Sequence, residues 1–162
     1  MNKTIIAHDA DEMEEIGVDL ARELEDGMLV SLVGPLGAGK TTLTKGIAKG
    51  LLVTDVVVSA SYLLERDYQG RLVLHHLDAY RIGSLAEFAE VGLDGLLPPE
   101  QGVTVVEWPE RVDGIVERSD FLVRIELLDG GARRVEITRA LTRPRLPRPR
   151  SAGSDRPRAG SL

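Results

Sequence analysis

The sequence MLVSLVGPLGAGKTT at residues 28–42 joins a continuous apolar run to a glycine-rich loop. Residues 28–33 have the length and uninterrupted hydrophobicity of a central strand that is covered on both faces. The loop at residues 34–41 has two glycines five positions apart, followed by Lys and Thr, and a helical pattern extends from Thr41 to about residue 48 or 49. A strand, a loop of this composition and a helix in that order predict an α/β protein.

The loop contains the residue types that surround a phosphate group. Glycines let the backbone turn its N–H groups inward, and the N-terminus of the following helix adds partial positive charge. In such a loop Lys40 would bind the β and γ phosphates of a nucleotide, and the Thr41 hydroxyl would hold Mg²⁺. A plain glycine-rich turn is the alternative, but the position between a strand and a helix favours nucleotide binding.

The other periodic segments predict a mainly parallel sheet with antiparallel additions, in a P-loop NTPase-like three-layer sandwich. A capping box of Asp9 and Glu12 begins one helix, Gly27 follows it, and Ser84 begins another. Helices are expected at 10–25 and from Ser84 to about residue 91. Strands are expected at 3–8, 56–58 and 103–106, with hairpins from 61–68 and 71–77 and from 120–128 and 132–138.

Composition limits the classes of protein. The chain has 162 residues, of which 43% are hydrophobic and 28% charged, so one globular domain is expected. The absence of cysteine excludes a disulfide framework, a thiolate zinc site and a cysteine nucleophile, and fits a reducing cytoplasm. Since the chain contains no apolar run near the roughly 18 residues that a membrane span needs, we expect a cytoplasmic protein that does not enter the membrane.

Charge divides the chain into two parts. The net charge of −6 is the sum of +6 over residues 139–162 and −12 over the rest. We therefore predict a folded domain at 1–138 and a basic Arg/Pro-rich tail at 139–162, which buries too little apolar surface to order itself. The tail is either an arm that contacts RNA phosphates or a solvated extension without a role.

Two carboxylates beyond the loop are candidates for chemistry. Asp78 follows the apolar run at 72–74 and the pair His75-His76, and Glu107 directly follows the strand at 103–106. Because α/β sheets present ligand-binding residues at the carboxyl ends of strands, either acid could bind a metal or orient water. The alternative is an acid that only keeps a strand end soluble. The two histidines face opposite sides of a strand, cannot share one metal, and are expected to pack or form hydrogen bonds.

Four blocks together resemble the bacterial TsaE family. They are GPLGAGKTT at 34–42, HLDAYR at 76–81, the stretch 87–92, and EWPE at 107–110, and their order and spacing match over roughly residues 5–138. The resemblance implies the small P-loop ATPase of tRNA threonylcarbamoyladenosine biosynthesis. It also implies that the protein acts together with the TsaD and TsaB proteins, which place the threonylcarbamoyl group on adenosine beside the anticodon of tRNA. In that system TsaE would support the turnover of the TsaD–TsaB complex.

The resemblance implies ATP and Mg²⁺ as cofactors and a role for each matching residue. The residues that it implies at the bound ATP are Asp9, Gly34, Gly37, Ala38, Gly39, Lys40, Thr41, Thr42, Ser61 and Trp108. Thr41 and Glu107 would be the Mg²⁺ ligands. Lys40, Asp78 and Glu107 would serve catalysis, with Asp78 acting from the surroundings of the metal. For Asp9, a plain helix cap is the alternative.

Two positions depart from the family pattern. Pro35 replaces the usual Asp, at a place where the backbone matters more than the side chain. The sequence SASY at 59–62 replaces the usual S-P-T-F/Y. Ser61 keeps a hydroxyl, but Ala60 lacks the fixed φ of proline, which loosens the segment. We predict retained nucleotide binding with weaker hydrolysis.

Two other functions remain open. One is a small-molecule kinase, although the segment 110–119 has Arg111 and Arg118 without a convincing lid. The other is an ATP-gated binding module whose hydrolysis has decayed. The −12 charge of residues 1–138 argues against this protein as the main tRNA-binding subunit. We therefore expect tRNA to bind the partner proteins.

Overall fold

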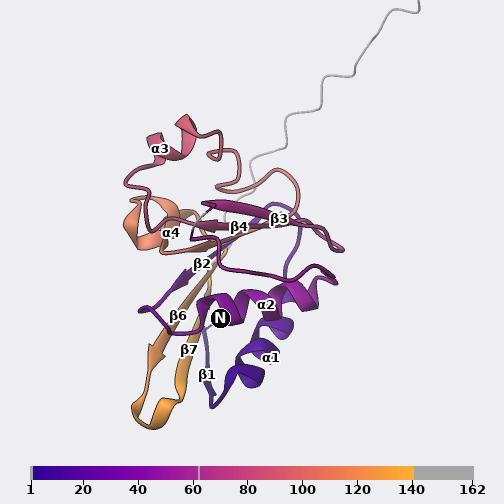
Figure 1. Ribbon diagram of the computed structural model, residues 1–162, viewed down its shortest axis with the longest axis vertical. Coiled ribbons are helices and arrows are strands. Elements are labelled where there is room, and N and C mark those ends of the chain that lie inside the picture. Colours follow the sequence, from indigo (N-terminus) through magenta and orange to yellow (C-terminus); the bar gives the residue numbers. More distant parts are fainter. Residues whose placement is uncertain (1, 62, 141–162) are drawn as a thin grey trace, which may run out of the picture.

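The computed structural model describes residues 2–61 and 63–140, whose seven strands form a single sheet of order β1-β7-β6-β2-β5-β4-β3 (Figure 1). In its centre β6, β2, β5 and β4 run parallel; β7 pairs antiparallel with β6 and with the edge strand β1, and the other edge strand, β3, pairs antiparallel with β4. This confirms the predicted α/β fold. The strands are β1 Asn2–Ala7, β2 Met28–Val33, β3 Glu65–Tyr68, β4 Leu74–Asp78, β5 Val103–Glu107, β6 Phe121–Leu127 and β7 Arg133–Arg139.

Helices cover both faces of the sheet, which gives the predicted three layers (Figure 1). The helical segments are α1 Ala10–Ala21, α2 Lys40–Gly50, α3 Leu85–Glu90, α4 Ile115–Arg118 and the 3-10 turns η1 Pro109–Arg111 and η2 Asp129–Gly131. Side chains alternate between the faces along β2, as expected for a strand buried on both sides. Val30 packs in the cluster of α1 and α2, and Leu29 packs with Phe88 of α3 and Ile115 of α4.

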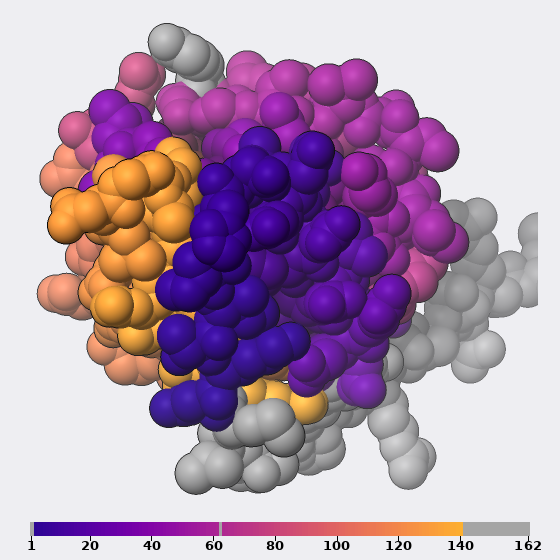
Figure 2. All heavy atoms as spheres, turned by 90° about the horizontal axis from the view of Figure 1, so that it is seen from below, coloured from indigo at the N-terminus to yellow at the C-terminus, as the bar shows by residue number. Residues whose placement is uncertain are grey.

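Glycines bring α1 and α2 into close contact. A Cβ atom at Gly17 would lie 2.4 Å from the carbonyl oxygen of Leu43, and one at Gly46 would lie 2.1 Å from that of Glu14. Larger residues would push the helices apart, so these glycines allow α1 and α2 to pack closely. Figure 2 shows the N-terminal segment with the β6–β7 hairpin on one side and the α2 region on the other.

Most predicted elements are confirmed with small shifts at their ends. α1 ends at Ala21 instead of residue 25, because the chain tightens: Glu23 N donates to Leu20 O and Leu24 N to Ala21 O. These i→i−3 bonds end the α-helix, yet Leu24 stays buried on the same apolar face. Both hairpins form, and Ser84 accepts a hydrogen bond from Glu87 N as the N-cap of α3.

The predicted strand at 56–58 is wrong. These residues lie outside the sheet; Val56 is 77% exposed, and only Val57 is buried. The N–H of Val58 donates to the Tyr68 hydroxyl at 3.1 Å, where a strand residue would bond to another backbone. Residues 61, 63 and 64, expected in a hairpin strand, instead lie outside β3, and Leu63 N and Leu64 N donate to Ala60 O.

The last strand of the described residues ends near residue 138, where the sequence predicts the domain boundary. β7 ends at Arg139, one residue past the boundary at 138, and residues 141–162 of the predicted tail lie outside the described residues. The expected disorder of the tail and its possible RNA contacts therefore stay predictions. Among the helices that the structure describes, none is long and apolar enough to cross a membrane.

Candidate functional site

The glycine-rich loop connects the end of β2 to the start of α2. Gly37 and Gly39 have φ values of +76° and +106°, which only glycine adopts readily. Ala38 N donates to Pro35 O at 3.1 Å and closes the turn between them. Gly39 is the N-cap of α2 and has no side chain to cap it, so the first N–H groups of this helix face the loop. The backbone therefore forms a concave, positive surface suited to an anion.

Lys40 is buried and lies at the base of this loop. Its ammonium group donates to the carbonyl oxygens of Gly34 and, at 3.4 Å, Pro35. The same group lies 3.5 Å from the centroid of the Trp108 ring. Burial lowers the pKa of Lys40, and the negative charge of Glu107 opposes that shift. Trp108 is held in a left-handed conformation with φ +58° and contacts the Tyr80 ring edge-on.

Glu107, at the end of β5, meets two hydrogen-bond donors. Its Oε1 accepts from Thr41 Oγ1 at 2.9 Å and from His76 Nε2 at 3.0 Å. His76 is fully buried on β4, and its Nδ1 has no partner in the part of the chain that the structure describes. This fixes the Nε2-protonated tautomer, because a proton on Nδ1 would be buried without an acceptor. The sequence predicted hydrogen bonding for His76 but not this partner.

Asp78 lies beside Glu107 in the β4–β5 register but has different contacts. Its Oδ2 accepts from Ser61 Oγ at 3.0 Å and its Oδ1 from Tyr80 N at 2.8 Å. Ser61 Oγ also lies 2.6 Å from Ser59 Oγ. Asp78 is 3% exposed and is not among the residues that line the pocket, so it holds Ser61 in place from behind.

The glycine loop, Lys40, Thr41, Glu107 and Trp108 line one cavity of about 330 Å³, a volume typical of small-molecule sites. The sequence-predicted residues that line it are Asp9, Gly37, Ala38, Gly39, Lys40, Thr41, Thr42, Ser61, Glu107 and Trp108. Gly34 contributes a carbonyl oxygen to Lys40 but does not line the cavity. The fold thus brings together residues from four separate parts of the sequence.

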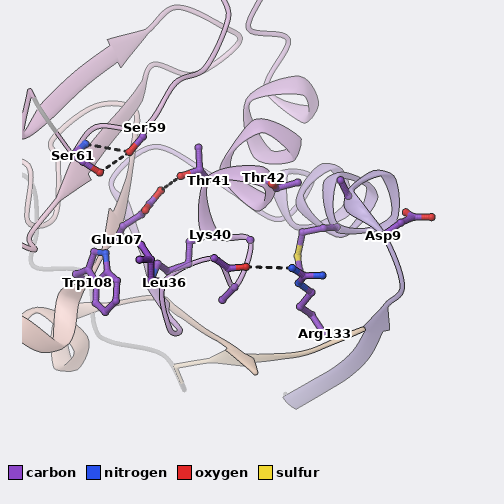
Figure 3. Close-up of a pocket in the computed structure, with 15 residues that line it drawn as sticks. Asp9, Leu36, Lys40, Thr41, Thr42, Ser59, Ser61, Glu107, Trp108 and Arg133 are labelled. Atoms are coloured by element: carbon purple, nitrogen blue, oxygen red, sulfur yellow. Dashed lines mark hydrogen bonds between the residues drawn. The ribbon is translucent and has the colours of Figure 1, made fainter. Parts of the chain in front are cut away.

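Asp9 and Arg133 form part of the opposite rim (Figure 3). Asp9 caps α1, since its Oδ1 accepts from Glu12 N at 2.8 Å, and it also lines the pocket, so the two interpretations of this residue are compatible. No pattern in the sequence predicted Arg133 as a site residue. It lies in no motif, and only the pairing of β7 with β1 and β6 brings it to the loop. A basic residue at the start of a strand gives no local signal.

The donor set is compatible with a hard divalent cation. Thr41 offers a hydroxyl oxygen and Glu107 a carboxylate, and these oxygens converge within 2.9 Å at the pocket wall. Mg²⁺ prefers oxygen ligands and completes its shell with water and substrate phosphates. The site therefore offers two oxygen ligands next to the phosphate-type loop.

A parallel sheet with this loop between β2 and α2 defines a P-loop-like α/β protein. Comparison with known proteins shows which family within this class the chain resembles. Residues 7–135 match the family model "Threonylcarbamoyl adenosine biosynthesis protein TsaE". The chain is similar to proteins named tRNA threonylcarbamoyladenosine biosynthesis protein TsaE. The relative from Treponema pallidum is 34% identical over 82% of this chain and 97% of its own, and the relative from Nostoc is 36% identical over 85% and 86%.

A solved structure gives the same result. The crystal structure of YdiB from Bacillus subtilis superposes with a TM-score of 0.67 at 30% identity and covers 86% of each chain. The chain described here belongs to the TsaE family of tRNA threonylcarbamoyladenosine biosynthesis. The resemblance that the motifs indicated is therefore confirmed.

Proposed function

We propose that this protein is an ATPase that binds and hydrolyses Mg-ATP in support of a TsaB–TsaD complex. That complex would form threonylcarbamoyladenosine next to the anticodon of tRNAs, with tRNA held by the partners. The single observation that carries the ATPase proposal is the convergence of Lys40, Thr41 and Glu107 on the glycine loop within one cavity. A cytoplasmic location, predicted from composition, belongs to the same proposal.

Each residue of the candidate site has a definable task in this reaction. The loop N–H groups and Lys40 neutralise the phosphate oxygens, and Thr41 and Glu107 would hold Mg²⁺. The ion, when bound, would stabilise the charge that develops on the phosphoryl group. Glu107 also stays oriented through His76, and Asp78 keeps Ser61 at the same wall of the cavity. Positioning and charge neutralisation are most of what phosphoryl transfer needs.

The kinase alternative is less well supported. Val112 and Ile115, in the segment 110–119, are buried in the second core cluster with Phe88. A lid must open and close over a substrate, and residues packed into a core do not suit that task. The ATP-gated module remains a second candidate, since Ala60 replaces proline and Lys40 is engaged with Gly34 and Trp108.

The experiment is to measure ATP hydrolysis with Mg²⁺, alone and after addition of the TsaB and TsaD proteins of the same organism. The proposal predicts slow turnover that rises with the pair. Tight ATP binding without hydrolysis in either mixture would favour the gated module. A rate of ATP hydrolysis that does not change when TsaB and TsaD are added would favour a kinase.

Glu107→Ala tests the assignment within the site. Loss of the carboxylate should reduce turnover on the order of a hundred-fold, because charge stabilisation at the reacting phosphate is lost. ATP affinity should fall much less, since the loop and Lys40 remain. Equal losses in affinity and turnover would mark Glu107 as structural instead.

A further inference from the structure

The guanidinium group of Arg133 lies over the phosphate-type loop. Its Nη2 donates to Gly37 O at 3.3 Å, its Nη1 donates to Gly131 O, and the side chain lines the cavity (Figure 3). Both acceptors are uncharged carbonyls. Among the described residues Arg133 forms no ion pair, whereas its neighbour Arg134 binds Glu126 at 2.8 Å. The positive charge of Arg133 therefore faces the cavity without a carboxylate partner.

The sheet places Arg133 and Glu107 on opposite sides of the loop. β2, which leads into the loop, lies between β5, which carries Glu107, and the pair β6–β7, which carries Arg133. Figure 3 shows the same arrangement, with Glu107 and Trp108 at one side of the loop and Arg133 near Asp9 at the other. The cavity thus has the oxygen ligands of Thr41 and Glu107 at one end, and at the other the guanidinium of Arg133 and Asp9, whose Oδ1 caps α1.

This polarity gives a direction to a bound nucleotide. The oxygen ligands of Thr41 and Glu107 suit a cation that bridges the terminal phosphates. The chain of phosphates then runs over the loop, and its nucleoside-proximal end reaches Arg133. A guanidinium presents several donors in a fixed fork that matches phosphate oxygens. Resting on the proposed function, we propose that Arg133 binds the α-phosphate of the nucleotide.

The test compares Arg133→Ala with Arg134→Ala in titrations of Mg-ATP and Mg-ADP. Both variants lose one positive charge from the same strand, but only Arg133 lines the cavity. Arg133→Ala should weaken ATP and ADP binding by the same factor, about ten- to a hundred-fold, as for a lost hydrogen bond to a charged group. Arg134→Ala should leave both affinities unchanged. Arg133→Lys should recover only part of the loss, because lysine keeps the charge without the fork.

Three outcomes would overturn the inference. If ATP affinity falls while ADP affinity does not, or if turnover at saturating ATP falls, Arg133 acts on the γ-phosphate. If the ratio of ATP to CTP affinity changes, it contacts the base. If Arg133→Ala binds both nucleotides like Arg134→Ala, Arg133 makes no contact with the nucleotide.

Circular dichroism and thermal melting of the nucleotide-free variants would identify loss of folding. If Arg133→Ala does not fold, the comparison of Arg133→Lys with the unaltered protein tests the inference. Failure of the unaltered protein to bind ATP or ADP would instead refute the proposed function.

Discussion

The ammonium nitrogen of Lys40 lies 3.5 Å from the centroid of the Trp108 ring, in cation–π contact. Trp108 directly follows Glu107, and the lysine also donates to the Gly34 carbonyl. Lys40 is the residue expected to contact the β and γ phosphates. A bound nucleotide would therefore compete with both the indole ring and the carbonyl for the same ammonium group.

Nucleotide binding should change the fluorescence of Trp108. It is the only tryptophan of the chain, so the tryptophan emission reports on the surroundings of this one ring, which Lys40 and Tyr80 contact. Transfer of the ammonium from the ring to a phosphate should shift the emission, and the titration should saturate with ATP. Lys40→Met is the control, since its spectrum should differ from the start and respond little. An emission spectrum that ATP leaves unchanged would show that the contact persists in the complex.

Replacement of His76 by Ala should weaken both the fold and the Mg²⁺ dependence of the site. The buried imidazole donates to Glu107 at 3.0 Å, and its loss leaves a cavity and a less oriented carboxylate. We expect a loss of about 2–3 kcal/mol in the free energy of unfolding. The Mg²⁺ concentration for half-maximal hydrolysis should also rise. If urea denaturation shows the loss while the Mg²⁺ dependence is unchanged, His76 only packs.

Ala60→Pro should restore rigidity to the segment that departs from the family. Ala60 is buried, and its carbonyl oxygen accepts from Leu63 N and Leu64 N, contacts that proline keeps. A compatible proline stabilises by about 0.4–1 kcal/mol through the unfolded chain. Because Ser61 follows directly, we expect a higher kcat with little change in ATP affinity. An unchanged or lower kcat would show that Ala60 does not limit hydrolysis.

Glu65 should make stability fall as pH rises. Burial raises the pKa of Glu65 to about 7, with a further rise from the hydrogen bond and charge of Asp67, opposed by His75. The folded chain therefore holds this proton more tightly than the unfolded chain, so stability is full below the unfolded pKa of about 4.5 and falls as pH passes through about 7.

Glu65→Gln should remove this dependence. Urea denaturation should show a gain over the unaltered protein at about pH 8 and none at about pH 4, with a gain below about 1 kcal/mol because solvent screens a partly exposed group. Glu126→Gln, which alters a surface carboxylate paired with Arg134, should give no gain at the higher pH. An equal effect of both variants at the two pH values would show that Glu65 ionises normally.

The parts of the fold that local patterns specify were predictable. The run at 28–33 and the loop after it define β2 and the start of α2, because a fully buried strand and a glycine turn leave strong signals. The three valines at 56–58 misled the prediction, since apolar β-branched residues favour a strand wherever they occur. In the structure β4 pairs directly with β5, and this valine segment lies outside the sheet. Such pairing is a long-range property.

Some residues of the candidate site could likewise be predicted from the sequence, and others could not. Lys40, Thr41 and Glu107 lie in motifs, and the structure brings them together as expected. Arg133 could not be predicted, because its place depends on β7 pairing with β1 and β6. The bond between His76 and Glu107 likewise depends on the β4–β5 register, which no spacing in the sequence encodes.

The most direct measurement is calorimetric titration of Mg-ATP into the full chain and into Lys40→Ala. Lys45→Ala is the matched control, because Lys45 is an exposed residue of the same helix. We expect saturable binding at one site in the unaltered protein and in Lys45→Ala, and a loss of affinity on the order of a hundred-fold or more in Lys40→Ala. A folded Lys40→Ala variant with unaltered affinity would contradict the assignment of this loop as the nucleotide site.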